Sequence, residues 1–122
     1  MTHFPFFQQE DSMQCGIACL RMICRYFGHN YSAEELSKLC KATVEGVSLL
    51  GITEAAEELG LKSESVRTKI EHFGNNNTPC ILHWNQNHFV VLYKVKKGRT
   101  FYVADPGKGL IKYNLEEFKK HW

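Results

Sequence analysis

The arrangement of apolar residues changes once along this 122-residue chain, from a helical spacing to short strand-like runs. Apolar side chains recur every three or four residues in the first half, whereas β-branched and aromatic residues are concentrated in the second. The expected helices cover residues 15–27, a short stretch that Ser32 caps, residues 48–59, and a final segment from Asn114 to Trp122. The expected strands cover residues 63–68, 80–84, 88–95, 101–104 and 110–113. Helices followed by strands predict an α+β domain, with N-terminal helices packed on a C-terminal antiparallel sheet.

Composition narrows the classes of protein to which the chain can belong. The length fits a single domain over residues 1–122, since domains most often contain about 100–150 residues. Hydrophobic residues make up 43% and charged residues 23%, which excludes a disordered chain. The formal net charge of +2 is too small to indicate a nucleic-acid partner. The longest apolar run, Phe89–Tyr93, contains five residues and is too short to span a bilayer.

The five cysteines, at positions 15, 19, 24, 40 and 80, point to a reducing compartment. Their number is odd, and the N-terminal residues lack the basic start and long apolar stretch of a secretory signal. Because no Cys-x-x-Cys pair occurs, a structural zinc site and a dithiol redox role are both disfavoured. Most of these thiols are therefore expected to be small buried apolar side chains.

Cys15 differs from the other cysteines because it lies where an irregular polar segment becomes a helix. The unpaired N–H groups and the dipole at a helix N-terminus favour a negative charge and lower the pKa of a thiol. Gly16, the next residue, is expected to leave room for a substrate backbone. The alternative is that Cys15 simply begins the buried face of the helix, as Cys19 and Cys24 continue it.

A nucleophilic thiolate needs an imidazole partner, and the chain has six histidines. If a hairpin turn is centred on Lys97-Gly98, residue 90 lies opposite Asp105. His88 is then its diagonal neighbour, within roughly 7–8 Å. A carboxylate at one ring nitrogen would fix the tautomer of His88 and support its protonated form. The alternative is an exposed histidine beside an ordinary Asp-Pro turn.

Gln9 lies six residues before Cys15 and is the candidate for stabilising an oxyanion. Its side-chain amide could donate a hydrogen bond alongside the backbone N–H of Cys15. Alone, Gln9 reads equally well as a loop glutamine. A glutamine, a cysteine at a helix start and a strand-borne His–Asp pair, in that order, together favour nucleophilic catalysis.

The chain resembles the bacteriocin-processing cysteine peptidases, family thirty-nine, along essentially its whole length. The cysteine motif of that family is matched by Gln9, Cys15, Gly16, Ala18, Met22 and Phe27-Gly28. The histidine motif is matched by His88-Phe89-Val90-Val91 and by Val103-Ala104-Asp105-Pro106. Gln14 departs from the acidic residue or threonine that often precedes the nucleophile, a difference expected to tune substrate choice or thiol acidity and to leave the catalytic residues intact.

The resemblance implies a papain-like fold in which Cys15 is the nucleophile, His88 the acid–base and Asp105 its orienting partner, with Gln9 in the oxyanion hole. It further implies cleavage of a precursor peptide after a Gly-Gly leader, coupled to export. Such a domain is the N-terminal part of an ABC transporter at the cytoplasmic face of the bacterial inner membrane, whose membrane and nucleotide-binding domains are its partners. It implies no cofactor in this domain and ATP elsewhere in the parent protein, since Gly107-Lys108-Gly109 is no phosphate loop.

Two rival functions also fit a chain of this kind. Haemolysin-type exporters carry a similar domain that has lost the cysteine and only docks the leader, and the presence of Cys15 argues against this class. A stand-alone thiol enzyme that transfers acyl groups to an amine would use the same residues. The products formed with an added amine would distinguish the acyltransferase from a peptidase.

Overall fold

The computed structural model describes residues 4–10, 14–42, 46–61, 69–74, 77–85 and 88–122. The helices are α1 (Cys15–Tyr26), α2 (Ala33–Leu39), α3 (Leu49–Glu58), the short 3-10 helix η1 (Ile70–His72) and α4 (Leu115–His121). The strands are β1 (Cys80–Trp84), β2 (His88–Lys96), β3 (Thr100–Asp105) and β4 (Gly109–Asn114). Within this described part of the chain, no helix is both long and apolar enough to cross a membrane.

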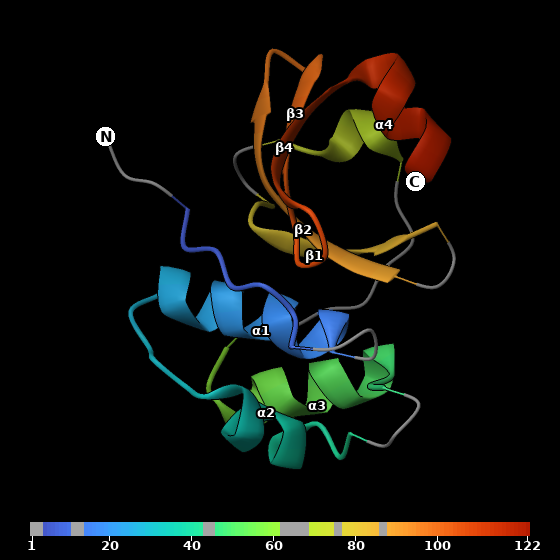
Figure 1. Ribbon diagram of the computed structural model, residues 1–122. Coiled ribbons are helices and arrows are strands. Elements are labelled where there is room, and N and C mark those ends of the chain that lie inside the picture. Colours follow the sequence, from blue (N-terminus) through green and yellow to red (C-terminus); the bar gives the residue numbers. More distant parts are fainter. Residues whose placement is uncertain (1–3, 11–13, 43–45, 62–68, 75–76, 86–87) are drawn as a thin grey trace.

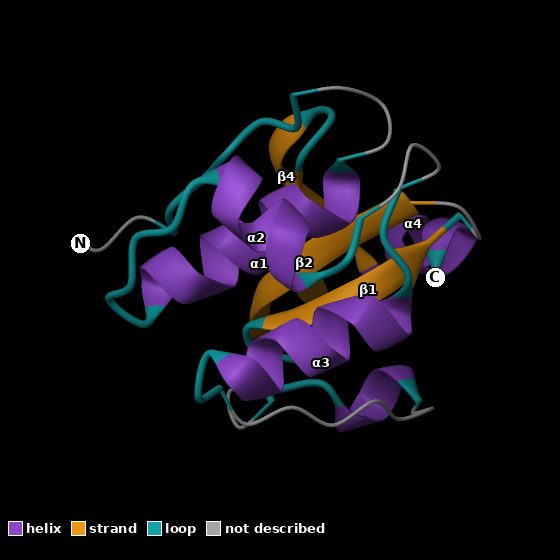
Figure 2. Cartoon of the chain, turned by 90° about the horizontal axis from the view of Figure 1, so that it is seen from below, coloured by secondary structure: helices purple, strands orange, loops and turns teal. Residues whose placement is uncertain are grey.

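The three N-terminal helices form one layer and the sheet forms the next (Figure 1). Strands β1 to β4 are neighbours in chain order, and every pairing is antiparallel. Seen from below, α1, α2 and α3 lie in front of the strands (Figure 2). The predicted α+β order is therefore confirmed. The strand expected at residues 63–68 lies outside the described residues.

Three of the helices begin after a residue whose side chain caps the first turn, at the positions that the sequence predicts. Ser32 and Asn114 each form a reciprocal capping box with the glutamate three residues on. Ser48 accepts a hydrogen bond from the Gly51 N–H and begins α3. Each of these bonds satisfies an N–H group that a helix end would otherwise leave unpaired.

Successive residues of each strand point to opposite faces of the sheet, so that one apolar core lies on each face. Val91 and Ala104 face α1 and pack with Cys19 and Met22. On the other face, the strands pack against α4 through its buried Phe118, together with Trp84, Val90, Leu92, Phe101, Val103 and Tyr113. Helix α1 thus lies directly on β2, and this contact brings its first residue to the sheet.

The register of the β2–β3 hairpin agrees with the predicted one at the end near Asp105 and not near the turn. Val91 pairs with Ala104. The same register, continued by one residue, places residue 90 opposite Asp105 as predicted. The loop, however, contains three residues, 97–99, rather than two. A bulge between Leu92 and Lys94 shifts the register back by one residue. The predicted register near Asp105 is thus correct because these two departures cancel.

The expectation for Gly16 is wrong. A Cβ at this position would lie 2.5 Å from Val47 Cγ1 and 3.1 Å from Ile52 Cδ1, so neighbouring side chains fill the space. Gly16 is itself buried in the contact between α1, α3 and β2. The missing side chain therefore allows close packing of α1, and leaves no room there for a substrate.

Candidate active site

Cys15 is the first residue of α1, and only 8% of its surface is exposed. The preceding residue, Gln14, gives no side-chain cap, so the first turn of the helix keeps its N–H groups for other partners. One of them, the N–H of Gly16, contributes to lowering the pKa of the Cys15 thiol. The predicted position of Cys15 at a helix start is confirmed.

His88 and Asp105 meet at the end of the sheet that faces the start of α1. His88 is the first residue of β2 and Asp105 the last residue of β3. Their Nε2 and Oδ1 atoms are 2.7 Å apart. The Asp105 side chain is 3% exposed and that of His88 is 23% exposed, so water screens this pair only weakly.

The thiol of Cys15 and the imidazole of His88 interact, and each shifts the pKa of the other. Burial raises the pKa of Cys15, but His88 and the backbone N–H groups of Phe89 and Gly16 lower it by more, so the net shift is downward. The hydrogen bonds with Asp105 and with Cys15 raise the pKa of His88 to about 9. Both shifts favour a thiolate beside an imidazolium. Because Asp105 occupies Nε2, Nδ1 is the ring nitrogen left for the sulfur.

Asp105 remains ionised although it is buried. Burial raises the pKa of its carboxyl group, while hydrogen bonds from His88 and from the backbone N–H of Gly107 lower it, and the net shift is downward. The Gly107 N–H lies 2.9 Å from the same Oδ1 that contacts His88. A charged acceptor held by two donors can orient the imidazole and stabilise its positive charge.

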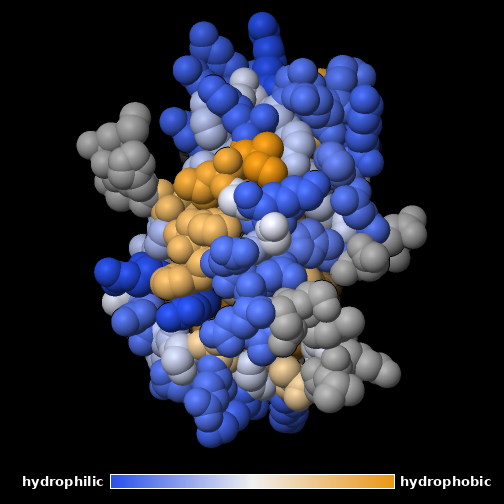
Figure 3. Space-filling view, in the orientation of Figure 1, coloured by the Kyte–Doolittle hydropathy of each residue, from blue (hydrophilic) through white to orange (hydrophobic). Residues whose placement is uncertain are grey.

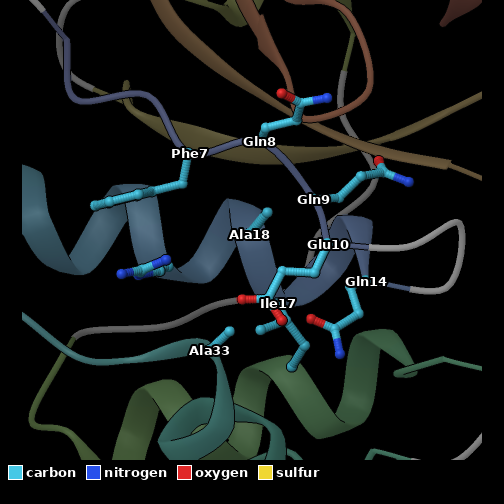
Figure 4. Close-up of a pocket in the computed structure, with 9 residues that line it drawn as sticks. Phe7, Gln8, Gln9, Glu10, Gln14, Ile17, Ala18 and Ala33 are labelled. Carbon is cyan, nitrogen blue, oxygen red and sulfur yellow. The ribbon is translucent and has the colours of Figure 1, made fainter.

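Gln9 reaches the site on an N-terminal segment that runs beside the turn after β3. Its backbone N–H donates to the carbonyl of Pro106 over 3.0 Å. Its side-chain amide lies near the same turn, since a Cβ added at Gly107 would be 3.4 Å from Gln9 Oε1. In Figure 4 the side chain of Gln9 extends to the right of the N-terminal segment, whereas that of Gln14 points down towards the helices below. The structure thus gathers Gln9, His88 and Asp105 around the start of α1.

The other four cysteines have pKa values shifted in the opposite direction. Burial raises the pKa of Cys24 and Cys40 to about 11 and that of Cys80 to about 12. Burial also raises the pKa of Cys19, well above its ordinary value. All five thiols are free, and Cys15 is the one among them whose pKa is lowered.

The packing of the N-terminal segment was not predicted from the sequence. The ring of Phe4 stacks on Tyr93 at 4.6 Å, and the guanidinium of Arg21 lies 4.0 Å above the ring of Phe7. A band of apolar surface runs over this segment and the neighbouring strands in Figure 3. Four aromatic or proline residues in a row, Phe4-Pro5-Phe6-Phe7, were the available signal. These contacts fix the segment that carries Gln9.

Metal ligation is a separate question for a site rich in His, Cys and Asp. In the described ranges of the chain, no group of three or more His, Cys, Asp or Glu side chains is arranged to hold a metal ion.

A low-pKa thiol at a helix start, facing a His–Asp pair on an antiparallel sheet, defines a cysteine peptidase with a papain-like fold. The family model for the Peptidase C39 family matches residues 3–122, and the chain belongs to that family. This is a family of cysteine peptidases, as the resemblance of the chain to the bacteriocin-processing enzymes predicted.

Curated relatives and solved structures agree with this assignment. The chain is 36% identical over 118 residues to the colicin V secretion/processing ATP-binding protein CvaB of Escherichia coli. That match covers 97% of the chain but 17% of the relative, and the lactococcin-G-processing and transport protein LagD of Lactococcus lactis is likewise covered over 17% of its length. A double glycine motif protease from an AMS/PCAT transporter, solved with its leader peptide, superposes with a TM-score of 0.88 at 35% identity, covering 97% of this chain and 84% of that one.

Proposed function

We propose that the chain is the peptidase domain of a peptide exporter and cuts precursor peptides after a double-glycine leader. The observation that carries the proposal is the Cys15–His88–Asp105 arrangement, with its thiol pKa lowered and its imidazole pKa raised to about 9. A buried, hydrogen-bonded ion pair of this kind serves a nucleophile rather than a surface for passive docking.

Cys15 acts as the nucleophile and His88 as the acid–base. The thiolate attacks the carbonyl carbon of the second glycine, and a C–S bond forms as the carbonyl electron pair moves to oxygen. The imidazolium of His88 gives its proton to the leaving nitrogen as the C–N bond breaks. Water then attacks the thioester while His88 takes its proton, and Cys15 leaves as a thiolate. Asp105 holds the ring through Nε2 during both steps.

Gln9 and the backbone N–H of Cys15 stabilise the oxyanion of each tetrahedral intermediate. The carbonyl oxygen of Gln9 lies on the Gly107 side of its amide, which leaves the NH₂ group as the donor. The backbone N–H of Cys15 belongs to the first turn of α1, where no intrahelical acceptor is available. Donors fixed before the reaction in a water-poor site stabilise developing charge most effectively.

The substrate class and the parent protein are inferred from relatives. A structural neighbour at 35% identity is described as a double glycine motif protease in complex with the leader peptide, and curated relatives are processing and transport ATP-binding proteins. Two glycines suit a narrow cleft, and binding of the leader at a distance can position the scissile bond. The chain spans about 17% of the curated relatives, so membrane and nucleotide-binding domains, ATP and a cytoplasmic-face location belong to the proposed parent transporter.

The test is cleavage of a synthetic precursor whose leader ends in Gly-Gly, followed by mass spectrometry. Cys15→Ala should abolish cleavage and retain binding of the leader, whereas the matched Cys19→Ala should keep its activity. Binding without hydrolysis by the wild-type chain would identify a docking domain instead. Formation of an amide with an added amine, in place of a free carboxylate, would identify an acyltransferase.

A further inference from the structure

The backbone conformation of Gly107 is one that residues other than glycine can also adopt. It follows Pro106 in the turn between β3 and β4, which the Lys108 N–H closes by donating to the Asp105 carbonyl over 3.0 Å. Gly98 and Gly109 have left-handed φ values of +66° and +120°, and that of Gly107 lies outside this region. Most residues can follow a proline in such a turn, so conformation does not explain the absence of a side chain.

The neighbours of Gly107 supply an explanation. A Cβ there would lie 3.4 Å from Gln9 Oε1, 3.8 Å from Gln9 Cδ and 3.6 Å from Asp105 Oδ1. A single methyl group would therefore fit in ordinary contact. A side chain that branches at Cβ adds two further carbon atoms next to these neighbours, and we expect them to crowd the Gln9 amide, the Asp105 carboxylate or both.

The same turn also holds the backbone of Gln9. The Gln9 N–H donates to the carbonyl of Pro106 over 3.0 Å, one residue before the glycine. Gln9 is thus held to the turn through its backbone, and its amide lies beside the space that a side chain at position 107 would enter. The Gly107 N–H meanwhile donates to Asp105 Oδ1 over 2.9 Å. The three-residue turn after β3 therefore lies between Gln9, which is the oxyanion donor, and the His88–Asp105 pair.

We propose that Gly107 is a positioning residue for the Gln9 amide, and that its lack of a side chain determines where that amide lies. The proposal rests on the proposed function, in which Gln9 stabilises the oxyanion. Gly107 does not touch the substrate in this account and acts only through Gln9. A branched side chain at position 107 lowers the rate of the chemical step and leaves the Cys15–His88 pair intact.

The experiment is a double-mutant cycle between Gly107→Val and Gln9→Ala, measured as kcat and KM for a synthetic precursor whose leader ends in Gly-Gly. Loss of a whole oxyanion donor costs about 10²–10³-fold in kcat, so its displacement by Gly107→Val should cost about tenfold, with KM changed less than twofold. In the Gln9→Ala background the same change should alter kcat by less than about twofold, because no amide is left to displace. Gly107→Ala should give a smaller loss than Gly107→Val.

Gly74→Val is the matched control, because a Cβ at that glycine meets no atom within 4 Å and its φ is not left-handed. Its kcat and melting temperature should equal those of the wild type. The rate of Cys15 alkylation by iodoacetamide should be unchanged in Gly107→Val, since alkylation needs the thiolate and not the oxyanion hole.

Equal losses from Gly107→Val in both backgrounds, an unchanged kcat, or slowed alkylation would overturn the proposal. Slowed alkylation would assign the effect to Asp105 and His88 instead. Failure of the proposed function is a different result: Cys15→Ala would then still cleave the precursor, or Gln9→Ala would retain full activity.

Discussion

Cys15 and Cys19 lie one turn apart on α1, yet their thiols have opposite properties. Cys15 begins the helix, contacts His88 and the N–H groups of Phe89 and Gly16, and has a lowered pKa. Cys19 is completely buried between α1 and the sheet, and its pKa is raised by burial and by the nearby charges of Cys15 and Asp105. Residue type and helix are the same for both. The difference therefore arises from the donors at the helix start and from the imidazole, not from the helix as a whole.

Removal of His88 should abolish most of the difference in pKa between Cys15 and Cys19. It should also cause the largest loss of activity among the changes predicted below. His88→Ala leaves Cys15 without its main hydrogen-bond partner, so the pKa of the thiol rises towards that of a buried cysteine. Loss of the acid–base should lower kcat by about 10³-fold. His83→Ala is the matched control, because His83 stacks on Phe89 in the neighbouring strand without contacting Asp105. Cleavage assays and Cys15 alkylation check both variants, and equal rates in the two would contradict the account.

The pH range over which the pair is active should narrow in Asp105→Asn. The pKa of His88 is raised to about 9 chiefly by Asp105, so the imidazolium persists up to about pH 9 in the wild type and is lost above it. Without the carboxylate this pKa falls towards its ordinary value of 6.5, and the alkaline limb of the kcat profile moves to lower pH. We expect a loss of about 10–100-fold at pH 8. An alkaline limb unchanged near pH 9 would show that Asp105 does not hold the ring charged.

Gly16→Ala should affect stability, with little direct effect on the chemistry. Its Cβ would meet Val47 Cγ1 at 2.5 Å, so the Val47 side chain or α1 must shift to admit it. Overpacking of this kind costs about 1–3 kcal/mol in the free energy of unfolding. Chemical denaturation measures the loss. An unchanged midpoint would mean that the space beside Gly16 is open, as a role in substrate access requires.

Cys19→Ala should have the smallest effect. It removes one buried sulfur atom from a packed cluster, which costs about 1 kcal/mol in the free energy of unfolding. Because Cys19 contributes no donor to Cys15, the pH dependence of Cys15 alkylation should not change. A measurable shift in the midpoint of Cys15 alkylation would show that Cys19 affects the ionisation of Cys15, contrary to this expectation.

The sequence predicted the individual parts of the site better than the contacts between them. Cys15 at a helix start and the capping boxes follow from local patterns, which is why the helices lie where expected. The approach of His88 to Asp105 follows from strand pairing. The bulge beyond Leu92 and the packing around Gly16 depend on tertiary contacts between distant segments, and no local pattern encodes them. The same holds for the contact between Gln9 and the turn at Pro106.

The central claim is that one thiol of the five ionises at a lower pH than a free cysteine because an imidazolium lies beside it. Alkylation of the native chain with iodoacetamide between pH 5 and 10, with each cysteine quantified by mass spectrometry, measures this directly. We predict that Cys15 is labelled first, with a midpoint below that of a free cysteine, whereas the four other thiols stay unreactive until the chain unfolds. Labelling of Cys15 at the same rate and midpoint as Cys80 would contradict the account.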